Sequence, residues 1–450
     1  MAKAKTQFVC QSCGAVFSRW IGRCEQCGTW NSLVEQALPT VTTGFGGRKT
    51  SGTAPLTPQK LDEIETKNSP RMPSGIDEVD QVLGGGIVPG AVMLLSGDPG
   101  IGKSTLVLQL AAILGQTKPV LYVSGEESAT QIKLRADRLG VKAAGLELLT
   151  ETNADAIAAT VAAGNYALVI IDSIQTMVVE ALTGAPGTVG QITASAQLLT
   201  AIAKHHDTAT LIIGHVTKEG NIAGPKILEH LVDVVLYLEG DRYGSFKALR
   251  GIKNRFGSTS EVGIFEMAET GLVPVANPSE ALLAERRPGP GSTVLATVEG
   301  SRPLLVEVQA LVAATPFGYP KRTAVGFDLN RLNLLVAVLS KRANLNLSNQ
   351  DIYVNIVGGL RITEPAADVA IILSIASALR NVAVPADLVA FGEVGLSGEV
   401  RSVSRVGVRL AEAKRLGLTR AVGPKHGSIV GMTGISSVDE VINLILPSAK

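Results

Sequence analysis

A phosphate-binding loop between an apolar strand and a helix constrains this chain more than any other feature of its sequence. The stretch AVMLLSGDPGIGKSTLVLQLAAIL contains Gly97-x4-Gly102-Lys103-Ser104, after a β-rich run and before apolar residues at helical spacing. This order of strand, glycine-rich loop and helix predicts a P-loop rather than a connecting turn. The residues expected to hold the nucleotide are Gly97, Asp98, Pro99, Gly100, Ile101, Gly102, Lys103, Ser104 and Thr105.

The pattern also predicts how ATP and Mg²⁺ are held. Glycines let backbone N–H groups turn onto the phosphates, and the helix N-terminus adds a partial positive charge. Lys103 is expected to reach the β- and γ-phosphates, and the Ser104 hydroxyl to bind Mg²⁺. Asp172 ends the buried-type strand YALVIIDS and is expected to organise the same metal ion.

Two further strands end in polar side chains at the same predicted edge. PVLYVSGEES ends in Glu126 and Glu127, and TLIIGHV carries His215 near its end, where a hydrogen-bond donor could contact the γ-phosphate. A carboxylate at this edge can align or deprotonate the attacking water, which favours hydrolysis over nucleotide storage. Paired acids at a strand end are equally often solvated, and a lone histidine is more often structural.

All four cysteines lie near the start of the chain, as Cys10-x2-Cys13-x10-Cys24-x2-Cys27. Two CxxC knuckles can close a tetrahedral thiolate site, so we expect a structural Zn²⁺ ion without catalysis. The ten-residue spacer is shorter than in the usual zinc ribbon. The alternatives are a redox CxxC or two disulfides, but neither needs paired knuckles.

Composition predicts a soluble, multidomain protein of the cytoplasm. The chain has 450 residues with 46% hydrophobic side chains, enough for two or three globular domains. Its 41 Lys and Arg nearly balance 40 Asp and Glu, so any nucleic-acid binding must be local. The start lacks an apolar leader, and no stretch is long and apolar enough to span a bilayer, so no membrane partner is expected.

Changes in pattern along the chain predict five segments. A zinc module over 1–35 precedes a linker over 36–70 that is rich in Gly, Thr and Pro. Apolar runs alternate with helical stretches over 71–275, which predicts an α/β core with a mostly parallel sheet. A second linker over 276–292 leads to a third unit, also α/β, over 293–450.

Six motifs follow one another along the chain: the zinc knuckles, SGDPGIGKST, YVSGEES, VIIDSIQT, GHVTKEG and KNRFG. In this order they resemble the motifs of the bacterial RadA (Sms) family of DNA-repair ATPases. The resemblance covers nearly the whole chain, and KNRFG is the family's own motif. It implies an ATPase core similar to RecA and to hexameric helicases of the DnaB type. It also implies that Glu126 activates water, that Glu127 is its neighbour, and that His215 links the γ-phosphate to the following segment.

The resemblance gives the KNRFG motif a role between subunits. In RecA-like rings the nucleotide lies between protomers, and cations of the next protomer complete the site. Lys253 and Arg255 are therefore expected to reach a neighbour's triphosphate, where a guanidinium neutralises charge that develops in the transition state. A basic pair after an apolar strand is otherwise usually a solvated turn.

Two segments are expected to face DNA in such a ring, ALTGAPGTVGQITAS and TKEGNIAGPK, the second with Lys218 and Lys226. Both have the composition of flexible loops whose amides and lysines follow phosphates, although ordinary surface loops share it. Neither contains aromatic residues for stacking, so binding is expected to be independent of base sequence. Arg48 and Lys49 are further candidates for phosphate contacts.

The third unit resembles the Lon protease domain without its catalytic residues. VGGLRITEPAADVAIILSIASAL resembles the segment with the serine nucleophile, and GEVGLSGEVRSVSRVGVRLAEAKRLG the segment with the lysine. These positions fall on Ala366 and Gly407, so both nucleophile and base are absent. We expect a scaffold that forms the ring or contacts DNA. A basic face is possible with Arg401, Arg405 and Arg409, although Arg409 can equally be a solvated surface charge.

The family resemblance predicts a helicase-like, DNA-dependent ATP hydrolase that is not a protease. It would act on single-stranded and branched DNA as a homo-oligomeric ring, by resemblance a hexamer, and promote branch migration in strand exchange with the RecA recombinase. The expected cofactors are ATP, Mg²⁺ and Zn²⁺. The alternatives are an ATP-driven protein-remodelling ring and a nucleotide-gated adaptor for the recombinase.

Overall fold

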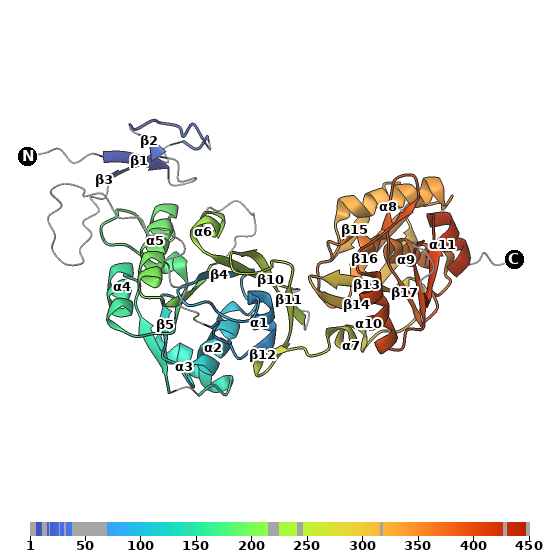
Figure 1. Ribbon diagram of the computed structural model, residues 1–450. Helices are drawn as coiled ribbons and strands as arrows, with labels where there is room; N and C mark the ends of the chain where they lie inside the picture. The colour runs from blue at the N-terminus through green and yellow to red at the C-terminus, as the bar shows by residue number, and fades with distance from the viewer. Residues whose placement is uncertain are drawn as a thin grey trace, which may run out of the picture. The chain divides into compact units, whose positions relative to one another are not determined.

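The computed structural model divides into two compact units (Figure 1). The first comprises Met1–Leu238 with Gly251–Ser258, and the second comprises Glu239–Arg250 with Thr259–Lys450. The structure describes residues 6–10, 16–17, 19–26, 28–30, 33–37, 70–142, 144–214, 225–240, 246–315, 318–425 and 430–446. Several residues singled out in the sequence lie outside these ranges: Cys13, Cys27, Arg48, Lys49, His215 and Lys218.

A small antiparallel sheet forms at the N-terminal end. Its strands are β1 (Thr6–Cys10), β2 (Val16–Phe17) and β3 (Leu33–Ala37), in the order β2-β1-β3. Cys10 pairs in register with Leu33, and both side chains are buried together with Cys24. The described part of this module is therefore a small hairpin core with two of the four cysteines inside it.

The core of the first unit is a parallel sheet with fully buried central strands. Its strands are β4 (Val92–Gly97), β5 (Val120–Ser124), β6 (Leu146–Thr150), β7 (Leu168–Asp172), β8 (Ala209–Ile213) and β9 (Val234–Glu239). The antiparallel strands β10 (Phe246–Asn254), β11 (Val262–Ala268) and β12 (Gly271–Pro274) complete the strand order β12-β11-β10-β9-β4-β8-β7-β5-β6. Of these, β11, β12 and residues 246–250 of β10 belong to the second unit. The P-loop strand β4 is thus separated from β7 by β8 alone.

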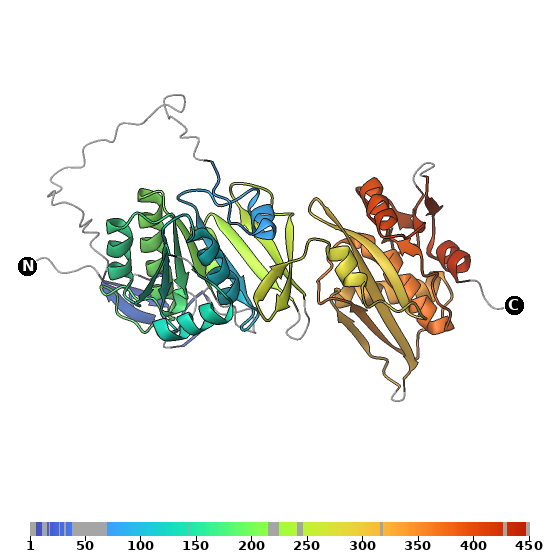
Figure 2. The same ribbon diagram turned by 90° about the horizontal axis from the view of Figure 1, so that it is seen from below.

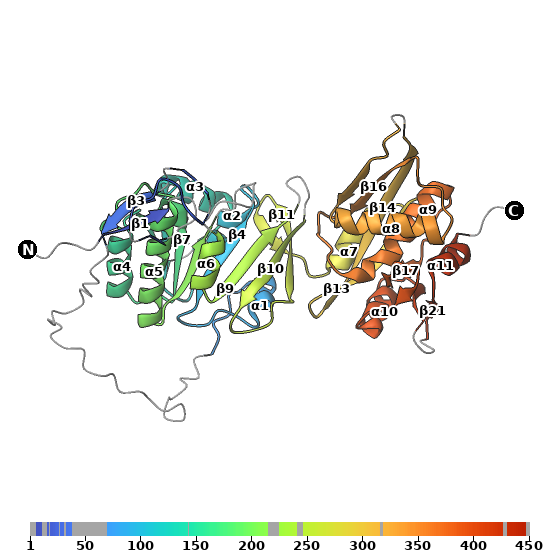
Figure 3. The same ribbon diagram turned by 90° about the horizontal axis from the view of Figure 1, so that it is seen from above.

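Helices cover both faces of this sheet. They are α1 (Asp77–Leu83), α2 (Lys103–Leu114), α3 (Ala129–Arg138), α4 (Ala154–Ala163), α5 (Val189–His205) and α6 (Pro225–Leu231). The chain passes from β4 to β5 in one direction along the sheet and from β7 to β8 in the other. Right-handed crossovers therefore place α2 and α3 on one face and α4, α5 and α6 on the opposite face, as Figures 2 and 3 show.

The second unit packs around a mixed sheet with the order β15-β16-β14-β13-β17-β20-β21. The strands are β13 (Ser292–Glu299), β14 (Arg302–Ala314), β15 (Arg322–Val325), β16 (Gln350–Ile356), β17 (Leu388–Ala390), β20 (Arg420–Pro424) and β21 (Met432–Ile435), with β18 (Glu393–Val394) and β19 (Val400–Arg401) as a separate pair. Its helices are α7 (Pro278–Leu283), α8 (Leu329–Arg342), α9 (Asp368–Arg380), α10 (Val406–Arg415) and α11 (Val438–Ile445). Helix α9 is the centre of this core, because residues 368–377 are buried without interruption.

The compact units do not follow the boundaries expected from the sequence. The segment 276–292, expected to be a linker, contains α7, whose Ser279 and Leu282 are buried. Its Pro and Gly residues suggested a flexible connector, but Leu282 packs in the apolar core of the second unit. Among the described helices, none is both long enough and apolar enough to cross a membrane.

Candidate active site

The P-loop connects the end of β4 to the start of α2. Gly97 and Gly102 have φ angles of 151° and 113°, in a region that residues with a side chain rarely adopt. A Cβ atom on Gly97 would also lie 2.3 Å from the Leu238 carbonyl oxygen. The glycine spacing thus permits a loop that turns sharply against β9 and places Lys103 as the first residue of α2.

Lys103 lies over its own loop and is 4% exposed. Its Nζ donates to the carbonyl oxygens of Gly97, at 2.7 Å, and Asp98, at 3.0 Å. Burial lowers the pKa of Lys103, while the charges of Asp172, Asp98 and Glu126 oppose that shift. The structure therefore brings three of the predicted site residues, Lys103, Asp172 and Glu126, into one electrostatic neighbourhood.

Asp172 ends β7 directly opposite the last residue of β5, Ser124. Its Oδ2 accepts a hydrogen bond of 2.5 Å from the hydroxyl of Tyr122, which is 1% exposed. Burial, and then the Asp172 charge, raise the pKa of Tyr122 well above its usual value, so the hydroxyl remains a donor. Sequence reasoning missed Tyr122, although its hydroxyl in the otherwise aliphatic run VLYV was a signal that it needed a buried partner.

Glu126 and Glu127 have different partners. The Ser173 hydroxyl donates to Glu126 Oε1, and Ser173 directly follows Asp172. Glu127 instead forms an ion pair with Arg135 of α3. Of the two acids, Glu126 is therefore the one held against the end of β7.

Gly125 explains how the ends of β5 and β7 come so close. A Cβ atom at Gly125 would lie 2.1 Å from the Thr176 hydroxyl oxygen. Its backbone N–H donates to the Asp172 carbonyl oxygen at 2.9 Å. Thr176 belongs to a short 3-10 helix, Ile174–Thr176, which leads from the site toward α5.

The first segment expected to contact DNA is only partly a loop. Its second half, from Val189, forms the start of α5, and this corrects the expectation of a loop over the whole segment. The buried Gln191 side chain accepts from Val179 N at 2.8 Å and donates to Leu182 O at 2.9 Å. Helix α5 therefore fixes the backbone of the preceding turn with one side chain.

The cations of the KNRFG motif bind groups of their own chain. Lys253 Nζ donates to the carbonyl oxygens of Glu229, at 2.6 Å, and Val232, at 2.7 Å, at the C-terminal end of α6. Arg255 lies 3.1 Å from Asp233 Oδ1, and its side chain is 53% exposed. Burial, and then Arg255, lower the pKa of Lys253.

Other members of the motif fix its turn. The Asn254 side chain accepts from the Phe256 N–H at 2.9 Å. The Arg71 guanidinium donates to the carbonyl oxygens of Phe256 and of Leu83, the last residue of α1. The turn that presents Arg255 is therefore anchored to α1, and Arg71 is a further residue that sequence reasoning missed.

The second unit places the two positions of the absent Lon dyad in different surroundings. Ala366 is 1% exposed, in the 3-10 helix Pro365–Ala367. Gly407 is exposed on α10, where an added Cβ atom would meet no atom within 4 Å. A side chain at 407 would therefore point into open space.

The basic face expected for this unit does not include Arg409, which is fully buried. Its guanidinium pairs with Glu364, donates to Ala296 O at 2.7 Å, and lies 5.7 Å from the Phe391 ring centroid. The expectation was wrong because the ion pair with Glu364 makes burial of the charge acceptable. Arg401 is exposed but paired with Glu399, and Arg405 donates to Gly300 O at 2.6 Å.

Family models match the chain in three places. The model described as AAA domain matches residues 59–221, and the Lon protease (S16) C-terminal proteolytic domain matches 337–432. A zinc-ribbon model, described as rubredoxin metal binding domain, matches 8–35. Together with the strand order, these matches confirm the expected fold: an α/β ATPase core of the RecA-like kind, a zinc ribbon and a Lon-like domain.

Curated relatives align with nearly the whole chain. A protein named DNA repair protein RadA from Halalkalibacterium halodurans is 49% identical over 455 residues, covering 99% of this chain and all of the relative. Proteins of the same name from Bacillus subtilis and Brucella abortus are 49% and 48% identical. Each of these two covers 94% of this chain, and the alignments span 93% and 92% of the relatives.

Two solved structures match part of the chain. The crystal structure of the RadB recombinase is 22% identical, with a TM-score of 0.36, over 45% of this chain and 98% of its own. A KaiC-like protein from Pyrococcus horikoshii is also 22% identical, with a TM-score of 0.40, over 46% of this chain and 99% of its own. At these scores neither likeness bears on function.

Proposed function

This chain belongs to the bacterial RadA family of DNA repair proteins, and on that premise we propose that it is a DNA-dependent ATPase that acts as a ring on single-stranded and branched DNA. The observation that carries the proposal is the convergence of Lys103, Asp172 and Glu126 at the edge where β4, β5 and β7 end. This set contains a phosphate-binding cation, a metal-binding carboxylate and a candidate general base.

The residues fit Mg²⁺ as well as ATP. A hydroxyl from Ser104 and a carboxylate from Asp172 are oxygen donors of the kind that Mg²⁺ prefers. When bound, the ion would neutralise charge on the β- and γ-phosphates. Tyr122 donates a hydrogen bond to one Asp172 oxygen and so orients it. The Lys103 ammonium group is bound to backbone carbonyls of the P-loop, and it can exchange these for phosphate oxygens of ATP.

Glu126 is the residue that we assign to the attacking water. Its carboxylate is oriented by Ser173, whereas the carboxylate of Glu127 is committed to Arg135. Glu126→Gln should lower kcat for ATP hydrolysis about 10²-fold or more while ATP still binds. Glu127→Gln is the matched control and should keep most of the rate. A full rate in the first variant and a large loss in the second would reverse the assignment.

Arg255 would complete the site of an adjacent protomer. Its side chain is half-exposed beside Asp233 and lies on a turn that Asn254 and Arg71 anchor, as a group that must reach across an interface requires. Near the γ-phosphate it would stabilise the charge of the transition state. Hydrolysis would then depend on assembly into a ring, for which the family suggests six protomers.

DNA would be held through its phosphates by segments that follow β7 and β8, and hydrolysis would drive branch migration with the RecA recombinase as partner. The chain has almost no net charge, so these contacts must be local. Binding of single-stranded DNA should weaken steeply with salt and strengthen with an ATP analogue. Binding that responds to neither would contradict a motor that holds phosphates.

A zinc ion in the N-terminal module is part of the proposal. Cys10 and Cys24 are buried where β1 meets β3, and thiolates are the ligands that structural zinc sites use. The four cysteines would leave no open coordination position, so the ion would hold the module together and take no part in hydrolysis.

The Lon-like domain favours one rival, an ATP-driven ring that remodels proteins. The buried Ala366 and the exposed Gly407 argue against proteolysis, but they leave remodelling open. Stimulation of ATP turnover separates the two functions. Single-stranded DNA should raise the rate and an unfolded protein should not; the opposite result would favour remodelling.

A further inference from the structure

The N-terminal module carries two exposed tryptophans, and they are the only two tryptophans in the chain. Trp20 is 54% exposed and Trp30 is 69% exposed. Indole rings are large and apolar, and a small module gains stability by burying them. Neither ring is needed for the buried cluster of Cys10, Cys24 and Leu33.

Both rings come close to the same glycine. A Cβ atom on Gly22 would be 3.7 Å from Trp20 Cη2 and 3.9 Å from Trp30 Cζ3. Arg23 and Trp30 form an isolated antiparallel bridge, which brings the two sequence segments together. The absence of a side chain at Gly22 leaves the edges of both rings accessible beside each other.

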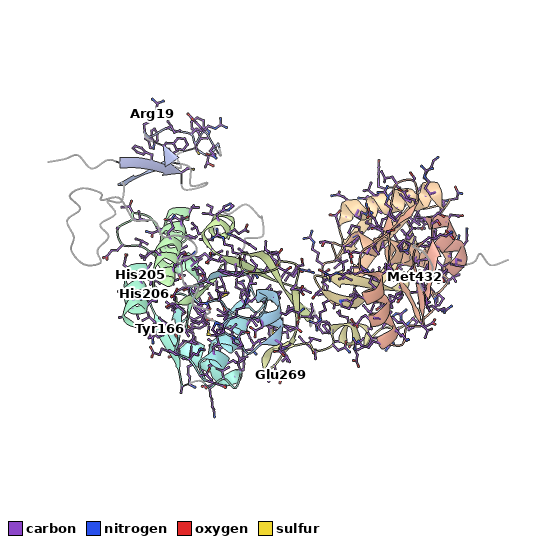
Figure 4. All side chains as sticks on the ribbon, in the orientation of Figure 1. Arg19, Tyr166, His205, His206, Glu269 and Met432 are labelled. Atoms are coloured by element: carbon purple, nitrogen blue, oxygen red, sulfur yellow. The ribbon has the colours of Figure 1, made fainter. Side chains whose placement is uncertain are left out.

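One arginine lies over the Trp30 ring, and another precedes Trp20 in the sequence. The Arg23 guanidinium carbon lies 5.8 Å from the Trp30 ring centroid, and Arg23 Nε donates to Gly28 O at 3.0 Å, which fixes the side chain. Arg19 directly precedes Trp20, is exposed, and extends from the module in Figure 4. Aromatic faces with adjacent guanidinium groups match the two parts of a nucleotide, a flat base and an anionic phosphate.

We propose that Trp20 and Trp30 form a base-stacking site for single-stranded DNA. The choice of ligand rests on the proposed DNA binding, which it deepens by assigning a surface to the bases. The two segments expected to contact DNA contain no aromatic residue and would bind phosphates alone. Stacking on indole tolerates any base, so the site would add affinity without sequence preference.

Tryptophan fluorescence tests this site directly in the full-length, zinc-loaded protein, because no tryptophan lies elsewhere. Addition of an oligothymidylate should change the emission with the same midpoint as the anisotropy of a labelled oligothymidylate. Trp20→Ala and Trp30→Ala should each weaken binding about tenfold. An oligonucleotide of the same length without bases should bind these variants and the wild type equally.

Three controls separate stacking from damage to the module. Zinc content should equal that of the wild type in each variant. Trp30→Phe should recover most of the affinity, because a phenyl ring also stacks. Leu134→Ala, at a side chain that is 65% exposed on α3, should have no effect.

The possible results have distinct meanings. In one case, anisotropy shows binding, but the emission does not change and the variants bind as the wild type does. The stacking site is then wrong, while the proposal of a DNA-dependent ATPase is unaffected. The exposed tryptophans would then be a surface for a protein partner. If variants with normal zinc content weaken binding of the base-free oligonucleotide equally, stacking is also excluded. If neither readout detects DNA at low salt, the proposed DNA binding itself fails.

Discussion

The P-loop edge of the first unit and the Ala366 region of the second unit both contain a buried cation, but the partners of that cation differ. Lys103 is held by two backbone carbonyls at the open end of a sheet, and carboxylates lie near its ammonium group. Arg409 is enclosed by the Glu364 carboxylate, Ala296 O and the face of Phe391. The first arrangement can exchange its partners for a ligand, whereas the second already satisfies its charge within the fold.

The comparison shows how a fold can keep a shape without the chemistry of its relatives. In the Lon-like domain, Glu364 lies two residues before Ala366 and pairs with Arg409. It also accepts hydrogen bonds from the Thr297 hydroxyl and the Val298 N–H. Four hydrogen bonds to this partly buried carboxylate connect β13, α10 and the turn before α9. At the ATPase edge, by contrast, Lys103, Asp172 and Glu126 come together from the ends of separate strands.

The largest effect is expected for Arg255, because its role would exist only in the assembled protein. Arg255→Ala should lower ATP turnover by about 10³-fold or more. Arg255→Ala protomers and Lys103→Ala protomers should each be nearly inactive alone. A mixture of the two should regain activity, because at some interfaces the intact P-loop of one protomer then faces the intact Arg255 of the other. Steady-state ATP hydrolysis on mixed samples measures this. No recovery on mixing, or a normal rate for Arg255→Ala alone, would contradict a role in trans.

The second largest effect concerns stability rather than turnover. Arg409→Met should lower the free energy of unfolding by about 3 kcal/mol, because the partly buried Glu364 would lose its charged partner and Ala296 O its donor. Arg401→Met removes the exposed pair with Glu399 and should cost less than about 1 kcal/mol. Urea unfolding of the three proteins gives the comparison. Equal effects of the two substitutions would show that the Arg409 pair does not organise the core.

Much of the ATPase edge could be predicted from the sequence because its signals are local. A strand, a glycine loop and a helix are adjacent in the chain, so Lys103 and Asp172 are placed by patterns of a few residues. Tyr122 and Ser173 depend on the pairing of β5 with β7, which no local pattern gives. Arg409 was misjudged for a similar reason: its partner Glu364 is 45 positions away in sequence.

The start of α5 was a different kind of error. Its glycines and threonines suggested a loop, but buried residues recur at helical spacing through Val189, Ile192, Ala196 and Leu199. That apolar periodicity was available in the sequence and outweighs a single Gly190. Residues His215 and Lys218 lie outside the described part of the chain, so their roles stay predictions.

A smaller effect is expected for the tyrosine behind Asp172. Tyr122→Phe removes a buried hydrogen bond to a carboxylate and should lower the free energy of unfolding by about 1.5 kcal/mol. It should also raise several-fold the Mg²⁺ concentration needed for nucleotide binding, because Asp172 loses the donor that orients it. Tyr166→Phe is the control, since Tyr166 bonds Glu147 in the same way at an exposed position. Equal behaviour of both variants in urea unfolding and nucleotide titrations would remove Tyr122 from the site.

The smallest effect is expected for an exposed pair in the second unit. Hydrogen bonds from Arg420 and Thr419 lower the pKa of Asp387 to about 2. The folded-state pKa lies below the unfolded value, so this stabilisation is present above about pH 4 and is lost as the pH falls toward about 2. Asp387→Asn should therefore be slightly less stable than the wild type at neutral pH and should match it at the acid end. Urea unfolding across this range checks the trend, and a constant difference at every pH would refute it.

Lys253 has a consequence for how a ring of these chains could respond to its ligands. The ammonium group supplies two hydrogen bonds to the last turn of α6, so a phosphate on another chain must compete with Glu229 and Val232 for it. If Lys253 binds that phosphate, the end of α6 loses its two hydrogen bonds. By thermodynamic reciprocity, any ligand that displaces the end of α6 then makes binding of the phosphate by Lys253 more favourable. The Lys253 side chain would then have two alternative binding partners, and its choice between them would couple nucleotide binding in one subunit to the conformation of its neighbour.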